Sequence, residues 1–234
     1  MKNHGLFPLL RAAFPHTVPV LTGYLCMGVA MGILLAAKGF HPLWATLMAC
    51  VVYAGSAQFV AVGLLAAGFD PLVMLVTILM VNARHIFYGL TSIERFRGFG
   101  RYRPYVIFAL TDETYALFNS VKIPDGIEER KFLTAIAALN QSYWIVGCTL
   151  GAFLGARIAF DVTGIDFVMT ALFVVILMQQ LGNPANRAPA LIGFVLAVVC
   201  RLVFGSEAFI VSTMLAMLAA FTLARSTLQK QADG

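Results

Sequence analysis

Long apolar runs separated by short polar stretches dominate the hydrophobic pattern of this chain. Several runs approach or exceed the roughly 17–25 residues that a helix needs to cross the hydrocarbon layer of a membrane. The pattern predicts an all-α fold, a polytopic membrane helical bundle of about seven to eight transmembrane segments. These segments cover approximately residues 18–37, 42–67, 71–90, 104–121, 132–156, 167–181, 189–204 and 208–224.

Composition agrees with the pattern and narrows the function classes. Of the 234 residues, 60% are hydrophobic and 12% are charged, against about 45–50% apolar and about 25% charged in soluble proteins. The net charge of +5 comes from scattered basic residues, which argues against a nucleic-acid partner. The four cysteines lie inside apolar segments without the close spacing of a metal site, so neither a metal nor a cofactor is predicted.

The connections between segments are short, so residues 1–234 are predicted to form a single integral membrane domain. The first residues lack the unbroken apolar centre of a signal peptide. Leu6, Leu10 and Phe14 recur at helical spacing, which predicts a short surface helix within residues 1–16.

Charge in the loops bears on orientation but does not decide it. The loop Glu94–Arg103 carries four arginines and one glutamate, which favours the cytoplasm. With three crossings before this loop, the N-terminus would lie outside. Lys2 and Arg11 oppose that assignment, as does the mixed charge of Lys122–Lys131, which one further crossing would place outside.

A weak internal similarity predicts an inverted repeat. Gly68-Phe69-Asp70 resembles Gly164-Ile165-Asp166, and each motif enters an apolar helix. An offset of three crossings would insert the two copies in opposite directions, over about residues 18–92 and 104–181. Inverted repeats are common in secondary transporters, which bind their substrate where the halves meet.

The third segment carries the polar residues Asn82, Arg84 and His85. Arg84 lies ten residues before Glu94, or about 15 Å along a helix, which is half of a hydrocarbon layer of roughly 30 Å. A charge at that depth is costly and usually faces a bundle interior or an aqueous path. The alternative is a helix that ends near residue 82, with Arg84 and His85 reaching toward the headgroups.

The fourth segment carries Asp112 and Glu113 at a similar depth, about 12 Å after Pro104. Neighbouring residues point about 100° apart around a helix axis, so one carboxylate can pair with Arg84 while the other stays free. A desolvated carboxyl without a partner can load and release a proton. The alternative is a static pair with Arg84 that only holds two helices together.

A third cluster, Tyr53, Gly55, Ser56 and Gln58, lies in the middle of the second segment. Gly and Ser together favour a helix kink. If the helix unwinds there, the free amides of its second half could bind a substrate carboxylate. The alternative is close helix packing through small residues, which leaves Gln58 unexplained.

Three further polar residues complete the predicted site. Tyr115 follows the two carboxylates, and Asn140 and Gln141 form an uncharged patch in the fifth segment, the counterpart of the 53–59 cluster if the repeat is present. A hydrogen bond between helices explains Asn140 and Gln141 equally well. We expect one polar cavity near mid-membrane, surrounded by Gln58, Asn82, Arg84 and Asp112.

Three strings carry a resemblance to a known family: YAGSAQF at 53–59, N-x-R-H followed by F-Y-G at 82–89, and TDETYAL at 111–117. In these the chain resembles the AzlC-type permeases of bacteria. The resemblance implies a transporter of the bacterial inner membrane that exports valine, leucine, isoleucine or similar solutes. It also implies a second, small membrane subunit of the AzlD type. No Walker motif is present, and we expect coupling to the proton gradient.

The leading hypothesis is therefore a transporter and not an enzyme. Arg84 or the amides near Gly55 would receive a substrate carboxylate, while Asp112 or Glu113 would receive its ammonium group or the coupling proton. The apolar end of the substrate would meet Phe59, Phe87 and Tyr88.

The alternative is an intramembrane hydrolase, with Ser56 as nucleophile and His85 as its base. That reading requires the two side chains to lie within hydrogen-bond reach.

Overall fold

The computed structural model describes residues 6–157, residues 167, 174, 177–178 and 181–182, and residues 184–223. The chain divides into two compact units, Met1–Asp166 and Phe167–Gly234. All regular elements among the described residues are helices, which confirms the all-α class. In the first unit they are α1 (Leu6–Ala37), α2 (Leu43–Val51), α3 (Gly55–Ala67), α4 (Pro71–Val81), α5 (Ala83–Phe96), η1 (Arg97–Tyr102), α6 (Arg103–Phe108), α7 (Asp112–Ser120) and α8 (Glu129–Arg157).

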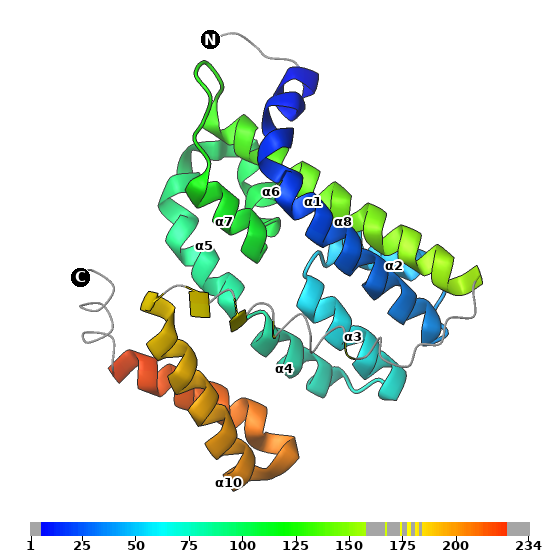
Figure 1. Cartoon of the computed structure of the whole chain (residues 1–234), viewed down its shortest axis with the longest axis vertical. Coiled ribbons are helices and arrows are strands. Elements are labelled where there is room, and N and C mark those ends of the chain that lie inside the picture. The colour runs from blue at the N-terminus through cyan, green and yellow to red at the C-terminus, as the bar shows by residue number, and fades with distance from the viewer. Residues whose placement is uncertain are drawn as a thin grey trace. The chain divides into compact units, whose positions relative to one another are not determined.

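The longest helices of this unit, α1 and α8, lie side by side (Figure 1). His16 contacts Phe132 near the start of α8, and a β-carbon on Gly155 near the end of α8 would lie 3.0 Å from Ile33. Contacts thus advance in the same direction along both helices, so α1 and α8 are parallel. Residues 6–16, predicted as a separate surface helix, are the first turns of α1.

Glycines bring the backbones of α1 and α8 into direct contact. A β-carbon on Gly32 would overlap backbone atoms of Cys148 and Ala152, and one on Gly151 would overlap the backbone of Val29. Small residues at such crossings let membrane helices approach closely. The α1–α8 pair is therefore a tightly fixed wall, against which the shorter helices pack.

The predicted second segment is not one crossing but two half-length helices. The hydroxyls of Thr46 and Thr149 lie 2.8 Å apart, and Gln141 donates to the Cys50 carbonyl at 3.1 Å, so α2 runs antiparallel to α8. The helix stops at Val52, near the middle of α8, and α3 begins at Gly55.

The next pair, α4 and α5, is broken at Asn82. The chain turns by 55° at Asn82 and continues in the same general direction. Asn82 lines the same cavity as Tyr53, so the end of α4 returns to the level at which α3 begins. Because residues 68–70 join α3 directly to α4, α3 must run back to the side where α2 entered. The α2–α3 pair is a re-entrant hairpin.

The predicted fourth segment is likewise divided into two short helices, α6 and α7, which form a second hairpin. Arg95, in the last turn of α5, bonds the Phe118 carbonyl near the end of α7 at 2.7 Å. It also pairs with Glu129, the first residue of α8, at 2.7 Å. Both ends of the α6–α7 segment therefore lie on one side, opposite to the entry side of α2–α3.

This geometry bears on the orientation, which the loop charges left undecided. The start of α1, the loop Glu94–Arg103 and the loop Lys122–Lys131 all lie on one side of the unit, so the N-terminus does not lie opposite the basic loop. The start of α1 and the arginine-rich loop therefore no longer call for opposite sides.

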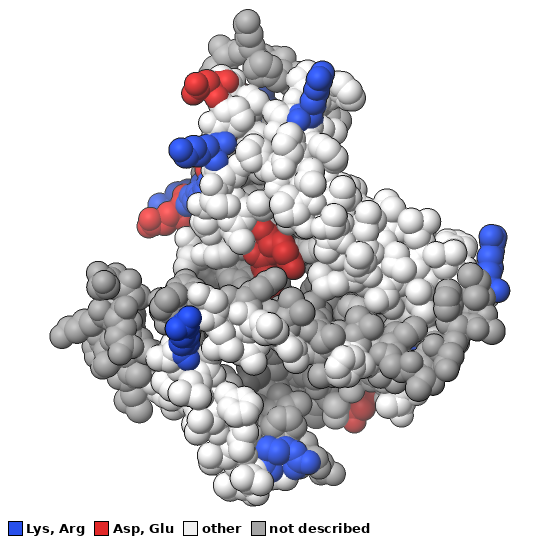
Figure 2. Space-filling view, viewed as in Figure 1, with Lys and Arg blue, Asp and Glu red and all other residues white. Residues whose placement is uncertain are grey.

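The predicted count of seven to eight crossings is not confirmed. By length and composition the described residues contain two membrane-spanning helices, Phe7–Ala37 and Arg187–Gly205, or three if α4–α5 is one bent span. The 29-residue α8 is more polar but extends about 43 Å beside α1. Figure 2 shows uncharged side chains over most of the described surface on this face, with a patch of acidic side chains near its centre.

The predicted repeat over 18–92 and 104–181 stays a prediction, because Gly164–Asp166 and most of 167–181 lie outside the described residues. The described part contains an inverted arrangement with other boundaries. Residues 43–96 and 103–157 each form a hairpin followed by a pass, entered from opposite sides.

The second unit contains α10 (Pro184–Leu223), which is interrupted at Gly205 with a φ of +73°. A β-carbon on Gly193 would lie 3.3 Å from the end of Met217, so the two halves of α10 fold against each other. This break separates the predicted segments 189–204 and 208–224.

The α1–α8 contact can be tested with a single methyl group. Gly151→Ala should destabilise the protein by about 1–3 kcal/mol, because the added carbon overlaps the α1 backbone. Gly63→Ala is the matched control, since nothing lies within 4 Å of its added carbon. Thermal unfolding in detergent, followed by size-exclusion chromatography, measures both. Equal melting temperatures for the two variants would contradict the close contact.

Candidate functional site

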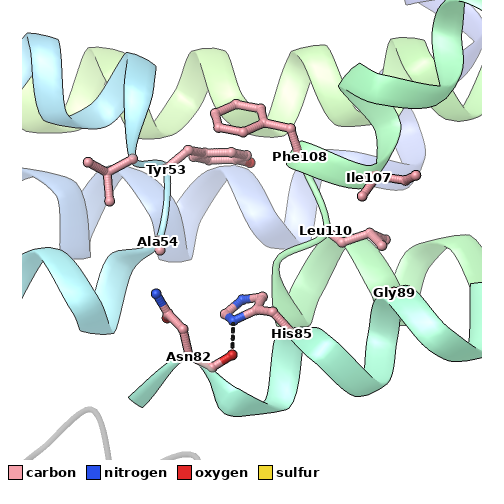
Figure 3. A pocket seen from close by; sticks show the side chains of 9 residues that line it. Tyr53, Ala54, Asn82, His85, Gly89, Ile107, Phe108 and Leu110 are labelled. Atoms are coloured by element: carbon pink, nitrogen blue, oxygen red, sulfur yellow. Dashed lines mark hydrogen bonds between the residues drawn. The ribbon is translucent and has the colours of Figure 1, made fainter. Parts of the chain in front are cut away.

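Three chain breaks of the first unit, those that follow α2, α4 and α6, meet at one cavity of about 180 Å³. Figure 3 shows Tyr53 and Phe108 on one side of this cavity and Asn82 and His85 on the opposite side. The two hairpin tips and the α4–α5 break thus border one partly open space between them. It is lined by Val52, Tyr53, Ala54, Asn82, His85, Gly89, Ile107, Phe108 and Leu110.

The tip of the α2–α3 hairpin has an unusual backbone. Tyr53 has a φ of +44°, the one positive φ of a non-glycine residue among those described. Such a conformation costs roughly 1 kcal/mol or more and persists where packing enforces it. Tyr53 is 3% exposed and its ring lies 6.1 Å from that of Phe108. The α3 helix then starts without a side-chain cap, so its first amides face the break unpaired within the helix.

The tip of the α6–α7 hairpin is capped by its own sequence. Thr111 accepts a hydrogen bond from the Thr114 amide at 3.3 Å, the usual arrangement at a helix start. Asp112 and Glu113 then occupy the first turn of α7, where the helix dipole favours negative charge. Local sequence therefore explains why α7 begins here and why its first turn carries both carboxylates.

Arg84 joins the starts of three helices. Its Nη2 lies 3.0 Å from Asp112 Oδ2 and donates to Ser56 Oγ at 2.9 Å. Tyr88 donates to the other Asp112 oxygen at 2.8 Å. Both carboxylate oxygens of Asp112 are thus engaged, and its side chain is 30% exposed. The pair ties α5 to α7 and, through Ser56, to α3.

Glu113 faces away from Arg84, as the helical angle between neighbours led us to expect. Its Oε2 accepts a hydrogen bond from Tyr24 of α1 at 2.8 Å. Tyr24 is 4% exposed and also lies 2.6 Å from the Thr111 hydroxyl. The two adjacent carboxylates therefore have different partners: a guanidinium for Asp112 and a hydroxyl for Glu113.

The amides of Gln58 and Asn140 are completely buried. Gln58 Oε1 accepts from the Trp144 indole at 2.8 Å, and Asn140 donates to the Thr114 hydroxyl at 3.0 Å. Among the described residues, Gln58 Nε2 and Asn140 Oδ1 have no hydrogen-bond partner. The structure thus places both side chains against neighbouring helices and not in the cavity wall.

The remaining predicted residues also contact neighbouring elements. Gln141 accepts from Tyr105 at 2.8 Å, which ties α8 to α6. Tyr115 stacks on Tyr88 with ring centres 4.4 Å apart. Gly55 packs against Trp144, since a β-carbon on it would lie 3.2 Å from the indole.

The predicted shared cavity is therefore only partly right. Of its four expected residues, Asn82 lines the cavity, whereas Arg84, Asp112 and Gln58 do not. Phe59 is 1% exposed and does not line it, and the side chain of Phe87 lies outside the described residues.

Sequence reasoning also missed residues that hold the site. Tyr24 and Trp144 read as ordinary members of apolar helices, but both use their polar tips to bond Glu113 and Gln58. An aromatic residue with a polar tip deep in an apolar segment was the available signal.

The hydrolase alternative is not supported. Ser56 Oγ accepts its hydrogen bond from Arg84, and His85 Nδ1 lies 3.3 Å from the Asn82 carbonyl. Within the described part of the chain, no hydrogen bond joins Ser56 to His85. That part also contains no group of three or more His, Cys, Asp or Glu side chains placed to hold a metal ion.

Comparison with known proteins identifies the family. The family model described as AzlC protein matches residues 19–158. The chain is 36% identical to the branched-chain amino acid transport protein AzlC of Bacillus subtilis, over 98% of this chain and 90% of that protein. It is 40% identical to an uncharacterized membrane protein of Helicobacter pylori, over 97% and 99% of the two chains. It is 27% identical to the inner membrane protein YgaZ of Escherichia coli, over 70% of each.

No solved structure matches the chain. The family model covers all three breaks that form the cavity and the whole α1–α8 wall up to residue 157, apart from the first turns of α1. The resemblance seen in the three polar strings is thus confirmed, and the chain belongs to the AzlC family of membrane proteins.

Proposed function

We propose that this protein exports branched-chain amino acids, such as valine, leucine or isoleucine, across the inner membrane of a bacterial cell. The proposal includes coupling to the proton gradient and a small AzlD-type partner subunit. The observation that carries it is the cavity at which two hairpins from opposite sides meet a broken helix, beside the Arg84–Asp112 pair. The name of the Bacillus subtilis relative supports the substrate class.

The size and lining of the cavity suit a small amphipathic solute. Its volume of about 180 Å³ is several times the roughly 30 Å³ that a water molecule occupies in the liquid. Phe108, Ile107 and Leu110 offer an apolar wall for an aliphatic side chain, opposite the polar Asn82 and His85.

The two ends of a zwitterion require opposite partners. In our proposal the unpaired amides at the start of α3 receive the carboxylate, as helix N-termini do for anions. Asn82, whose buried Oδ1 lacks a partner among the described residues, accepts from the ammonium group. The substrate thereby replaces hydrogen bonds that the three breaks leave unmade.

Glu113 is the proposed proton carrier. Asp112 is held by Arg84 and Tyr88 through both oxygens, so it serves to tie α5 to α7. Glu113 has the neutral Tyr24 hydroxyl as its partner and no cation within salt-bridge distance among the described residues. A carboxylate in that position can gain a proton without breaking an ion pair.

Export by the protein with its partner is the first prediction. Cells that carry both subunits and are fed a valine dipeptide should hold internal valine several-fold lower than cells without them. Proteoliposomes should show the same transport when both subunits are present, and less than a tenth of it with this chain alone. Mass spectrometry of internal valine measures the first result and isotope flux the second.

Glu94→Gln is the control variant, because it removes a carboxylate of the basic loop far along α5 from Arg84. It should export at the rate of the unaltered protein. Unchanged internal valine in cells that produce both subunits would contradict the export proposal. Full transport by this chain alone would show that the partner subunit is not required for export.

The two carboxylates should respond unequally to neutralisation. Asp112→Asn breaks the half-buried pair with Arg84, so we expect a loss of about 1–3 kcal/mol in stability and weak transport. Glu113→Gln keeps a hydrogen-bond acceptor for Tyr24, so the protein should fold normally but transport should no longer respond to the proton gradient. Thermal unfolding and flux at several values of external pH separate the two outcomes. If both variants keep full pH-dependent export, neither carboxylate carries the proton.

A further inference from the structure

Among the described residues that line the cavity, Gly89 is the one glycine, and it lies in the interior of α5. His85, which also lines the cavity, precedes it by four residues, so the two positions share one face of the helix. Figure 3 shows Gly89 toward the same end of the cavity as Ile107 and Leu110, away from Asn82. A side chain at position 89 would therefore extend into the apolar end of the cavity.

Neither the backbone nor the packing of α5 requires a glycine at this position. Gly89 lies in helical backbone without a positive φ, so any residue can adopt its conformation. A β-carbon on Gly89 would meet no described atom within 4 Å, whereas one on Gly151 would overlap the backbone of Val29. Glycine in a helix interior is also less favourable than alanine. The missing side chain thus lowers stability, and what it leaves in return is space at the cavity.

The width of the cavity at its apolar end depends on position 89. The facing wall is formed by Ile107 and Leu110, next to the tip of the α6–α7 hairpin. In an apolar pocket, one methylene more or less changes the preference between two substrates by roughly 10- to 200-fold. The whole cavity measures about 180 Å³, so even one added methyl group would alter which side chains fit.

We propose that Gly89 is a specificity-determining residue, which sets the largest aliphatic side chain that the cavity accepts. The inference rests on the proposed function, because it takes the cavity as the place where the amino acid binds. The outermost methyl group of leucine or isoleucine then occupies the space where a β-carbon of residue 89 would lie. Valine is one methylene shorter and needs less of that space. The groups that bind the carboxylate and the ammonium group lie at the other end, so they are unaffected by a change at Gly89.

The test compares two substrates that differ by one methylene. Proteoliposomes that contain this chain and its small partner subunit are used to measure transport of isotope-labelled isoleucine and valine. In Gly89→Ala, the ratio of isoleucine to valine transport should fall about tenfold, because the added methyl group shortens the apolar end. Gly89→Ser adds a side chain of similar size and should lower the ratio as well, since size and not polarity decides.

Gly63→Ala is the matched control. It adds the same carbon within α3, again with no described atom within 4 Å, but Gly63 does not line the cavity. Its transport ratio should equal that of the unaltered protein. Both alanine variants should melt at no lower temperature than the unaltered protein, because the added carbon has room and alanine favours a helix.

Each outcome bears on a different part of the proposal. A lowered ratio in Gly89→Ala, with an unchanged ratio in Gly63→Ala, supports the role of Gly89. If Gly89→Ala keeps the unaltered ratio, or loses transport of both amino acids equally, Gly89 does not select by size and the inference fails while export stands. If the unaltered protein with its partner transports neither amino acid, the proposed function fails and the inference fails with it.

Discussion

The structure depends on one constraint: a chain that is interrupted at mid-membrane must satisfy its exposed backbone groups with protein. Lipid offers no hydrogen bonds, so non-helical backbone at that depth has to be enclosed. Three interruptions, at 52–54, 82 and 109–111, meet at one place. Because the three interruptions lie together, each one shields the exposed backbone groups of the others from lipid. The α1–α8 wall shields them on the remaining side. The cavity is what remains where the three breaks do not fill the space between them.

Arg84 and the wall serve this constraint in different ways. The glycine contact of α1 with α8 is rigid, because backbone lies on backbone and no rotamer can relieve an added methyl group. The bonds of Arg84 to Ser56 and Asp112 join side chains from separate half-helices, and such bonds can break and form again. A hairpin tip can move if a rigid part of the protein supports it and if the bonds that hold it can break. The α1–α8 wall is the rigid part, and the bonds of Arg84 are the ones that can break.

Sequence reasoning found the polar residues but not the path of the chain between them. The depth of Arg84 and of Asp112, and the angle between Asp112 and Glu113, follow from helix geometry, and the structure agrees with the resulting pair. Run length cannot tell a crossing from a hairpin of the same length. The segment 104–121 is apolar enough to cross a membrane. Its interruption could have been predicted from Thr111, because this residue caps the start of a new helix.

The same count of crossings is why the loop charges left the orientation undecided. Counting 104–121 as a crossing placed the loop Lys122–Lys131 on the wrong side, and reading 42–67 as one crossing placed the N-terminus opposite the basic loop. Only a contact between distant residues, such as Arg95 with Glu129, reveals that two loops share a side. Likewise, no local pattern relates Tyr24 to Glu113, because their proximity is created by the packing of α1 against α7.

The parallel wall has a consequence for how the protein is made. Gly28 and Gly32 leave the ribosome more than a hundred residues before their partners Gly147 and Gly151. Both re-entrant hairpins are therefore synthesised before the surface that supports them exists. Contacts so distant in sequence form late. Until α8 enters the membrane, the half-helices have to be sheltered by the insertion machinery or held outside the lipid, so a ribosome stalled before Glu129 would present an intermediate unable to bury its own hairpin tips.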